Sequence, residues 1–371
     1  MQFRNIIGQE SVKKQLRLSV QDKRIPHAQL FFGPQGVGKL QLAIAYAQYL
    51  ACPNRTEEDS CGVCPSCLQY QQLQHPDLHF AYPIVKTDVG DTCDDFSSQW
   101  RSILLDKKYF DLDDWYTALG VSTKQGMIYE KESGEILRKL SLKSFGEGYK
   151  VMIIWQAEKM NIACANKLLK LLEEPPEKTL FLLISEHPNE LLATILSRVQ
   201  QIYVPALAEQ TLSELFSSDI AHIANGSYLT ARKLTEQADE NSLMLDDFIA
   251  LMRRAWLVGR KRDYAALQQM RKWSNDMADA KVGRERQKAF LQYAQRQVRE
   301  NYIRNLNHPE INYQTSAEAT FSDKFAPFIH DGNVEAIMNE LDKAEQQIAQ
   351  NGNAKIIFFD LCLQMIVLIK K

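Results

Sequence analysis

The sequence has little of what marks an exported or membrane protein. No run of about 18 uninterrupted apolar residues, the length needed to span a bilayer, occurs among its 371 residues. The best candidate, 356–369, is broken by Asp360 and Gln364, which would share one stripe of a helix and so indicate a buried helix. The segment MQFRNIIGQE lacks the charged-then-apolar layout of a signal peptide. We therefore expect a cytoplasmic protein.

A strong charge of one sign is also missing. The formal net charge is -2, with 45% hydrophobic and 24% charged residues, as in an ordinary globular protein. A protein that wraps DNA with its own surface is usually more basic. Any role on DNA should therefore be shared with partners or confined to a patch. There is no internal repeat and no low-complexity tract, and the length predicts two or three domains.

Strand and helix signals alternate over residues 1–205. Apolar runs typical of buried strands end the segment 26–32 and occur at 149–155 and 179–185, and a final strand is expected at 201–204. Helical periodicity separates them, which predicts an α/β domain with a mainly parallel sheet. After Pro205 the strand signals stop, and we expect a small helical domain at 206–246 and an all-helical domain at 247–371. The acidic segment 88–114 shows no clear period and is expected to be an irregular insertion or a mobile loop.

A glycine-rich loop follows the first predicted strand and matches the phosphate-binding pattern G-x-x-x-x-G-K. Four residues would direct backbone N–H groups and an ammonium group toward phosphate oxygens: Gly33, Gly36, Gly38 and Lys39. The next residue should be Ser or Thr, whose hydroxyl binds Mg²⁺, but it is Leu40. A helix-capping turn that never binds phosphate is the alternative.

A second magnesium-binding element is missing as well. P-loop ATPases need a carboxylate pair at the end of a later strand, and YKVMIIWQAEKM has Trp155 and Gln156 there. Glu158 lies two residues further and is not assumed to replace them. Because phosphoryl transfer depends on Mg²⁺ and positioned cations, we expect no useful ATP turnover. Binding of ATP without hydrolysis is left open.

Four of the seven cysteines cluster in the order Cys52-x₈-Cys61-x₂-Cys64-x₂-Cys67. Four thiolates satisfy a tetrahedral Zn²⁺ and leave no position for water, so such a site is structural. An iron–sulfur cluster and free thiols in an exposed loop are the alternatives. The other three cysteines are isolated and expected to be structural: Cys93, Cys164 and Cys362.

In this order, the segments resemble the clamp-loader branch of the AAA+ proteins. The resemblance is carried by GQE at 8–10, IPHAQLFFGPQGVGK at 25–39, YKVMII at 149–154, NKLLKLLEEPP at 166–176, FLLIS at 181–185 and TILSR at 194–198. The four-cysteine insert, the degenerate nucleotide site and the Ser-Arg pair are similar to the delta-prime type of bacterial DNA polymerase III clamp-loader subunit. The resemblance implies a P-loop (AAA+) domain, a small helical lid domain and a C-terminal collar domain, and it favours zinc over iron at the cysteines.

The resemblance also implies a role for Arg198. In this family a Ser-Arg-Cys triplet places an arginine finger in the ATP site of the adjacent subunit, where it stabilises charge on the transferring phosphoryl group. The triplet here is Ser197-Arg198-Val199, so the arginine is kept and the cysteine is replaced. A surface arginine at a helix end is the alternative. The nucleotide-sensing arginine of the lid, in a G-S-x-R context, is replaced by Leu229, and Arg232 lies nearby but out of register.

The implied function is support of ATP-dependent loading of the sliding clamp onto primed DNA by a subunit that does not itself hydrolyse ATP. The implied partners are the gamma/tau ATPase subunits and the delta subunit, in a heteropentamer within the DNA polymerase III holoenzyme. Two alternatives stand beside it. One is an active AAA+ ATPase of the clamp-loader or helicase-loader type, motivated by Lys39. The other is a zinc-dependent nucleic-acid-binding module, motivated by the cysteines alone.

Overall fold

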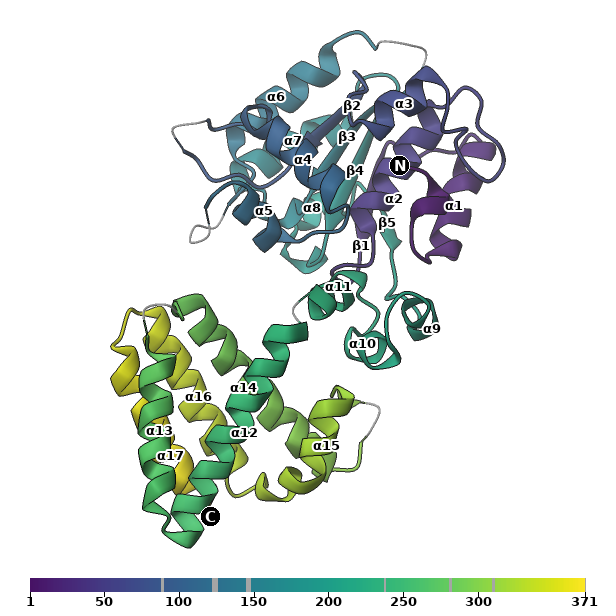
Figure 1. The fold of residues 1–371 in the computed structure, drawn as a ribbon. Coiled ribbons are helices and arrows are strands. Elements are labelled where there is room, and N and C mark those ends of the chain that lie inside the picture. Colours follow the sequence, from purple (N-terminus) through teal and green to yellow (C-terminus); the bar gives the residue numbers. More distant parts are fainter. Residues whose placement is uncertain are drawn as a thin grey trace. The chain divides into compact units, whose positions relative to one another are not determined.

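The computed structural model describes residues 1–87, 90–121, 126–144, 148–236, 238–279, 282–308 and 311–370. The chain divides into two compact units (Figure 1). One comprises Met1–Ser217 with Ala224–Arg232, and the other Ser218–Ile223 with Lys233–Lys371. The three-domain division, with boundaries near 205 and 246, stays a prediction.

The first unit is built on a parallel sheet of five strands in the order β2-β3-β4-β1-β5. The strands are Ala28–Phe32 (β1), Leu78–Ala81 (β2), Lys150–Trp155 (β3), Thr179–Ser185 (β4) and Gln200–Tyr203 (β5). This confirms the predicted α/β class. Every residue of β3 and β4 is buried, as expected of strands covered on both faces. The short edge strand β2 was not predicted.

Helices cover the sheet. The central helix α2 packs against β1, β3 and β4, and α6 packs against β2 (Figure 1). The helices of this part of the chain are Glu10–Gln21 (α1), Lys39–Ala51 (α2), Pro65–Gln71 (α3), Ser97–Asp106 (α4), Leu112–Ala118 (α5), Glu130–Ser141 (α6), Ile162–Glu173 (α7), Ala193–Leu196 (α8), Glu209–Ser213 (α9) and Tyr228–Glu236 (α11). Short 3₁₀ helices are Phe3–Asn5 (η1), Cys93–Phe96 (η2), Ala157–Lys159 (η3), Pro188–Glu190 (η4) and, in the second unit, Ala326–Phe328 (η6).

The expectation of an irregular segment at 88–114 is wrong for its described residues, 90–114; Asp88 and Val89 lie outside them. This stretch contains η2 and α4 and the start of α5. Its acidic residues serve as helix caps: Thr92 with Asp95 and Asp111 with Asp114 form reciprocal capping boxes. Phe96, Trp100 and Phe110 of the segment pack into the main core, so the lack of a clear period reflects short helices rather than a loop.

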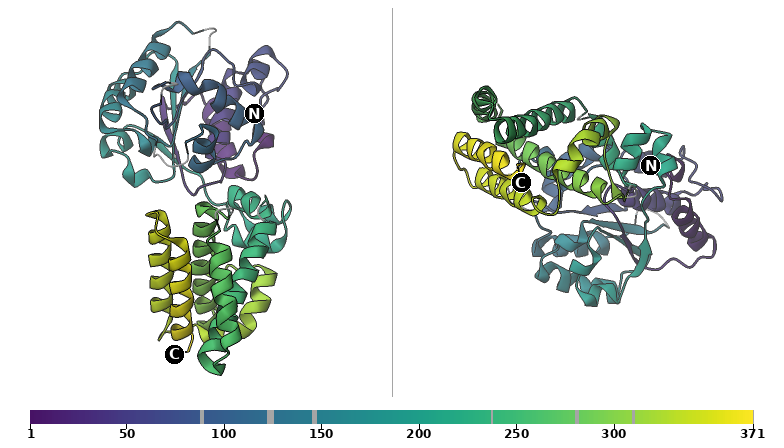
Figure 2. Two further views of the ribbon diagram at one scale, coloured as in Figure 1. Left: turned by 60° about the vertical axis from the view of Figure 1, so that its left-hand side comes forward. Right: turned by 90° about the horizontal axis from the view of Figure 1, so that it is seen from below.

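The described residues of the second unit form helices joined by short loops and contain no strand, which confirms the loss of strand signals after Pro205. Its helices are Ser218–Ile223 (α10), Ala238–Lys261 (α12), Tyr264–Met277 (α13), Arg284–Asn305 (α14), Ser316–Phe325 (α15), Val334–Ala349 (α16) and Ala354–Leu368 (α17). Figure 2 shows these helices from two further sides. They enclose an apolar core of their own. Within the described part of the chain, no helix combines the length and the apolar composition that crossing a membrane requires.

Candidate functional site

The glycine-rich loop has the local structure that its sequence predicts. Strand β1 ends at Phe32 and α2 begins at Lys39, with Gly38 as its N-cap. Gly36 and Gly38 adopt φ angles of 75° and 94°, a left-handed conformation that other residues rarely adopt. The strand, glycine-rich turn and helix that the sequence predicts are therefore present, with the turn at the carboxyl end of β1.

The side chain of Lys39 is turned back onto its own loop. Its Nζ donates a hydrogen bond to the carbonyl oxygen of Gly33 at 2.8 Å and another to that of Pro34. The residue is only 5% exposed, and burial lowers the pKa of its ammonium group to about 8, although the carboxyl groups of Glu186 and Glu158 oppose that shift. A bound phosphate would have to displace these contacts.

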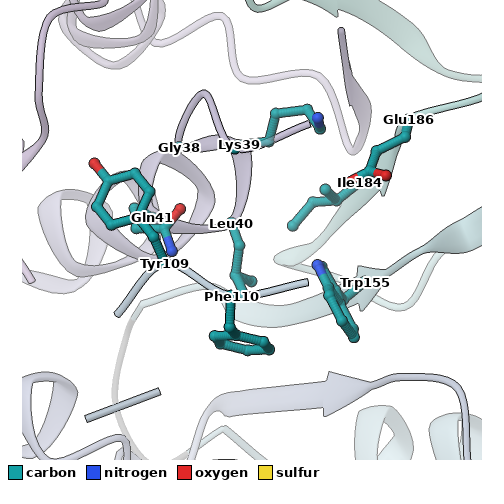
Figure 3. Close-up of a pocket in the computed structure, with 10 residues that line it drawn as sticks. Gly38, Lys39, Leu40, Gln41, Tyr109, Phe110, Trp155, Ile184 and Glu186 are labelled. Atoms are coloured by element: carbon teal, nitrogen blue, oxygen red, sulfur yellow. The ribbon is translucent and has the colours of Figure 1, made fainter. Parts of the chain in front are cut away.

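Two carboxyl groups, those of Glu186 and Glu158, lie near Lys39, where the negatively charged phosphates of a nucleotide would be expected. Figure 3 shows Lys39 extending toward Glu186, which follows β4. Burial raises the pKa of the Glu186 carboxyl, and Lys39 opposes this shift. Glu158 accepts hydrogen bonds from the backbone N–H groups of Glu186 at 3.0 Å and His187 at 3.4 Å. Glu158 thus fixes the backbone after β4, and Glu186 would repel a phosphate oxygen near Lys39.

Apolar side chains fill the rest of the pocket (Figure 3). Leu40, which replaces the magnesium-binding Ser or Thr, points toward Phe110, and Trp155 lies beside them. Together with Tyr109 and Ile184 they leave a cavity of only ≈ 30 Å³. Pockets that bind small molecules usually measure about 300–1,000 Å³. Leu40 and Trp155, which stand at the positions expected to bind magnesium, therefore also fill the space in the pocket.

Residues 107–110, which we call the closing segment, are fastened over the loop by Arg232. Its guanidinium donates to the backbone carbonyls of Tyr109 at 2.7 Å and Lys107 at 3.1 Å. The side-chain amide of Gln41 donates to the carbonyl of Lys108. A Cβ placed on Gly38 would come within 3.3 Å of the Tyr109 ring. Tyr109 therefore lies directly against the glycine at the start of α2.

The segment that would carry the nucleotide-sensing arginine also closes on the loop. Leu229, at the start of α11, is buried. A Cβ added to Gly36 would come within 2.7 Å of the Leu229 Cβ and within 2.3 Å of the Ser227 hydroxyl. An apolar side chain thus covers the loop at the position where family ATPases are expected to place a cation.

Arg198 lies at the surface and is paired within its own unit. Its Nε donates to the Glu173 carboxylate at 2.8 Å, and its NH1 donates to the Thr194 carbonyl at 2.8 Å. The side chain is 33% exposed and that of Glu173 is 48% exposed. Because this ion pair faces solvent, it contributes little to stability, and the guanidinium can exchange Glu173 for another anion at low cost.

Arg198 and Lys39 lie at opposite ends of two paired strands. Arg198 precedes β5, whereas Lys39 follows β1, and these two strands pair in parallel from Gln29 opposite Gln200 to Phe32 opposite Tyr203. A strand advances by about 3.3 Å per residue, so the length of β5 separates the two cations. Arg198 therefore does not belong to the phosphate loop of its own chain.

The four clustered cysteines come together at the other end of α2. Cys52 is the C-cap of α2 and Cys64 the N-cap of α3. All four sulfur atoms lie within 4.8 Å of one another. The distances from Cys52 Sγ to Cys64 Sγ and from Cys61 Sγ to Cys67 Sγ are both 3.9 Å. A tetrahedral zinc ion with bonds of about 2.3 Å requires sulfur atoms about 3.8 Å apart, so the cluster fits such an ion.

Backbone N–H groups are directed at the sulfur atoms. The N–H of Cys61 donates to the sulfur of Cys52 at 3.3 Å. The N–H of Cys64 donates to the sulfur of Cys61 at 3.4 Å, and that of Cys67 donates to the sulfur of Cys64 at 3.4 Å. Backbone donors lower the pKa of the Cys61 thiol to about 6, whereas burial raises that of Cys67 to about 12. A bound cation stabilises thiolates, and the N–H groups would share the negative charge of four of them.

Comparison with known proteins decides the family. A family model described as "DNA polymerase III, delta subunit" matches residues 8–208, which is more than half of the chain. The chain belongs to this family. A DNA polymerase III subunit delta' of Bacillus subtilis is 31% identical over 218 residues, which cover 58% of this chain and 54% of that protein. A subunit tau/gamma of Haemophilus influenzae is 28% identical over 251 residues, covering 64% of this chain and 30% of that protein.

The match to this DNA polymerase III family is confined to part of each relative. The chain spans less than two thirds of the length of either of these two curated proteins. Among solved structures, a gamma-subunit-related protein of Thermotoga maritima aligns over 98% of this chain and 100% of that chain, with 13% identity and a TM-score of 0.40.

The loop, the surface arginine and the four cysteines of this family member are predicted from the sequence. The closing segment is not. The contact between Arg232 and the closing segment joins residues 123 positions apart. No local pattern marks Tyr109 or Phe110 as nucleotide-site residues. The only available signal was Arg232 itself, which stands close to the position of the missing sensor arginine.

Proposed function

We propose that the chain is a delta-prime-type clamp-loader subunit that does not hydrolyse ATP. It would act in the cytoplasm with gamma/tau ATPase subunits and a delta subunit to load the sliding clamp onto primed DNA. The observation that carries this proposal is the state of Lys39. It is held by the carbonyls of its own loop, beside Glu186 and behind the apolar side chains that replace the magnesium contacts.

The same proposal gives Arg198 its role as an arginine finger acting in trans. Its exposure and its distance from the chain's own phosphate loop support a partner site rather than an internal one. In a complex, the phosphates of ATP bound to a neighbour would replace Glu173 as the anion that the guanidinium contacts. A planar guanidinium that binds two oxygens at once is well suited to this exchange.

We further propose that Cys52, Cys61, Cys64 and Cys67 hold a structural Zn²⁺. The separations of the sulfur atoms and the N–H donors around them support this metal. When bound, the ion would supply only a cross-link, because four cysteines leave no coordination position for water or substrate. Side chains at the N-terminus would help to hold the module in place. Gln2 donates to the Ser60 carbonyl at 2.6 Å, and Asp59 accepts from the backbone N–H of Phe3 at 3.1 Å.

The Arg198→Ala substitution tests the proposed function. In a clamp loader reconstituted with its ATPase and delta subunits, clamp and primed DNA, we expect it to lower the steady-state ATPase rate of the complex. Loss of an arginine finger costs about 10³–10⁵ in the affected site. The other ATP sites of the complex limit the overall fall, so single-turnover hydrolysis would be the sharper measurement.

Two controls separate a finger from a structural effect. Glu173→Gln removes the ion pair but keeps the arginine, and should leave the rate near that of the unmodified complex. Arg138→Ala removes another exposed arginine that pairs with a nearby carboxylate, and should also be neutral. If Arg198→Ala leaves the ATPase rate unchanged, or if Glu173→Gln lowers it equally, Arg198 does not act as an arginine finger. Robust Mg²⁺-dependent hydrolysis by the purified chain, abolished by Lys39→Ala, would instead establish the ATPase alternative.

A further inference from the structure

An apolar groove lies within the second unit, between α12 and α15. It has a volume of ≈ 560 Å³, which is within the range of ligand sites. Figure 1 shows α12 and α15 as neighbouring helices of the same unit. All its lining residues belong to this unit and lie among the described residues: Ile249, Met252, Arg253, Trp256, Ala317, Thr320, Phe321, Lys324, Phe325, Phe328 and Ile369.

The two walls of the groove are helix faces with the same spacing. On α12 the lining residues stand at 249, 252, 253 and 256, and on α15 at 317, 320, 321 and 324. Positions i, i+3, i+4 and i+7 lie on one side of a helix. At 1.5 Å per residue, each wall is about 10 Å long, or two turns. The groove therefore has the length to receive about two turns of another helix.

Aromatic rings form one side of the groove. Phe321 stacks on Phe325 with centroids 4.8 Å apart, and Phe325 on Phe328 at 6.2 Å. The edge of Trp256 meets Phe328 at 6.2 Å. Trp256 and Phe321 are only partly buried and Phe328 is exposed. Clusters of partly exposed aromatic side chains are common where proteins bind partners tightly.

The charges at the groove are all positive. Arg253 comes from α12 and Lys324 from α15, so each wall contributes one cation. Among the described residues, neither cation has a hydrogen-bond or ion-pair partner. Lys261 adds a third, with its ammonium 5.3 Å from the centre of the Trp256 ring. The nearby acidic residue Asp323 is already paired with Arg304. An occupant that complements this surface is apolar where it enters the groove and acidic at its margins.

We propose that this groove docks a short amphipathic helix of a partner protein, with bulky apolar side chains on the inserted face and carboxylates on both flanks. The occupant follows from the groove, which is mainly apolar over two helical turns and has on each side one cation without a partner among the described residues. Helix-in-groove binding uses anchor residues at i, i+3, i+4 and i+7, the same spacing as the walls. This inference does not depend on the role of the chain in clamp loading.

The test uses the full chain and three fluorescein-labelled peptides of about 15 residues, four helical turns. The first carries Leu and Phe at the anchor spacing with flanking Glu. The second carries Lys in place of each Glu, and the third has the composition of the first with the spacing scrambled. We expect fluorescence anisotropy to show saturable binding of the Glu peptide, roughly tenfold weaker binding of the Lys peptide, and no saturation with the scrambled one.

Variants place the binding in the groove. Arg253→Glu with Lys324→Glu should reverse the preference between the Glu and Lys peptides, and Phe321→Ala should weaken both. Arg271→Glu with Lys272→Glu makes the same charge change at exposed positions of α13 outside the groove, and should leave the preference unchanged. Circular dichroism confirms that each variant remains folded.

Other results would overturn the proposal. Equal binding of the Glu and Lys peptides would show that the cations of the groove do not select an acidic partner. An Arg253→Glu/Lys324→Glu variant that behaves like the Arg271→Glu/Lys272→Glu control would move the binding elsewhere. A concentration-dependent dimer in sedimentation, dissolved by the groove variant, would assign the groove to a second copy of the chain.

Discussion

Helix α2 has a candidate binding element at each end, and the two differ in what they have kept. At its N-terminus, the phosphate loop keeps its glycines and Lys39, but apolar side chains and a carboxyl group fill the space. At its C-terminus, Cys52 joins three other cysteines with the separations of a tetrahedral metal site. The loop thus keeps its glycine turn while other side chains occupy the space beside it, whereas the four cysteines bring together ligand atoms that could hold a metal ion.

This difference shows why a sequence motif and a working site are separate things. A phosphate loop depends on what surrounds it, because its N–H groups and lysine act only on a ligand that can enter. A four-cysteine site depends almost entirely on its own four side chains. Three experiments sharpen the contrast, and we give them in order of expected effect.

The largest effect is expected at the cysteines. Cys67→Ser should remove the bound metal and lower the free energy of unfolding by about 4 kcal/mol, because metal binding is coupled to folding of the module. Metal content by elemental analysis and urea unfolding measure both. Cys164→Ser, at a buried cysteine outside the cluster, should retain the metal. Undiminished zinc in Cys67→Ser would contradict the assignment, and visible absorption with bound iron would favour the iron–sulfur alternative.

A smaller effect is expected from Lys39, and its sign depends on pH. The pKa of Lys39 is about 8 in the folded chain, against about 10.4 for an unfolded lysine. Between these values the unfolded state binds more protons, so Lys39 makes stability rise with pH. Lys39→Met should remove up to about 3 kcal/mol of that rise between pH 7 and pH 10.5.

Urea unfolding of the unmodified chain and of Lys39→Met at several pH values gives the difference directly. Lys14→Met, at an exposed lysine of α1, is the control for losing an ordinary ammonium group. If the free energy of unfolding depends on pH in the same way for the unmodified chain and for Lys39→Met, then Lys39 is solvated and the loop is not closed over it.

The smallest effect is expected from Arg232→Met, which removes the donors to the carbonyls of Lys107 and Tyr109. Each such bond contributes about 0.5–1.5 kcal/mol, so the loss should be about 1–2 kcal/mol and local. Hydrogen exchange should become faster at the closing segment and remain unchanged in β3 and β4. Arg24→Met, at an exposed arginine, should alter neither region. Unchanged exchange at 107–110 would show that Arg232 does not hold the closing segment.

The sequence predicts those features that depend on neighbouring residues. Strands β1, β3 and β4 were predicted from apolar runs, which are typical of strands covered on both faces, whereas β5, also predicted, is mostly exposed. The glycines, Lys39 and the cysteines were found because their spacing is local. The edge strand β2 was missed because LHFA is too short to show a pattern, and α4 and α5 were missed because their acidic caps looked like loop composition.

Features that bring distant residues together could not be predicted. The closing segment is held against the glycine-rich loop by Arg232 and Gln41, which are both distant from it in the sequence. The groove in the second unit combines positions near 250 with positions near 320, and each half alone looks like an ordinary amphipathic helix. In both cases the missing information was which surfaces meet in the folded chain.

The strand order has a consequence for how the protein folds while it is being synthesised. Strand β1 lies between β4 and β5, whose residues are translated some 150 positions after it. At about 5–20 residues per second, this strand stays unpaired at both edges for roughly 8–30 s while the rest of the sheet is synthesised. The cysteine module, spanning 52–67, would be able to bind the proposed metal ion soon after it emerges. Nascent chains paused before residue 179 should therefore be the form that most needs a chaperone.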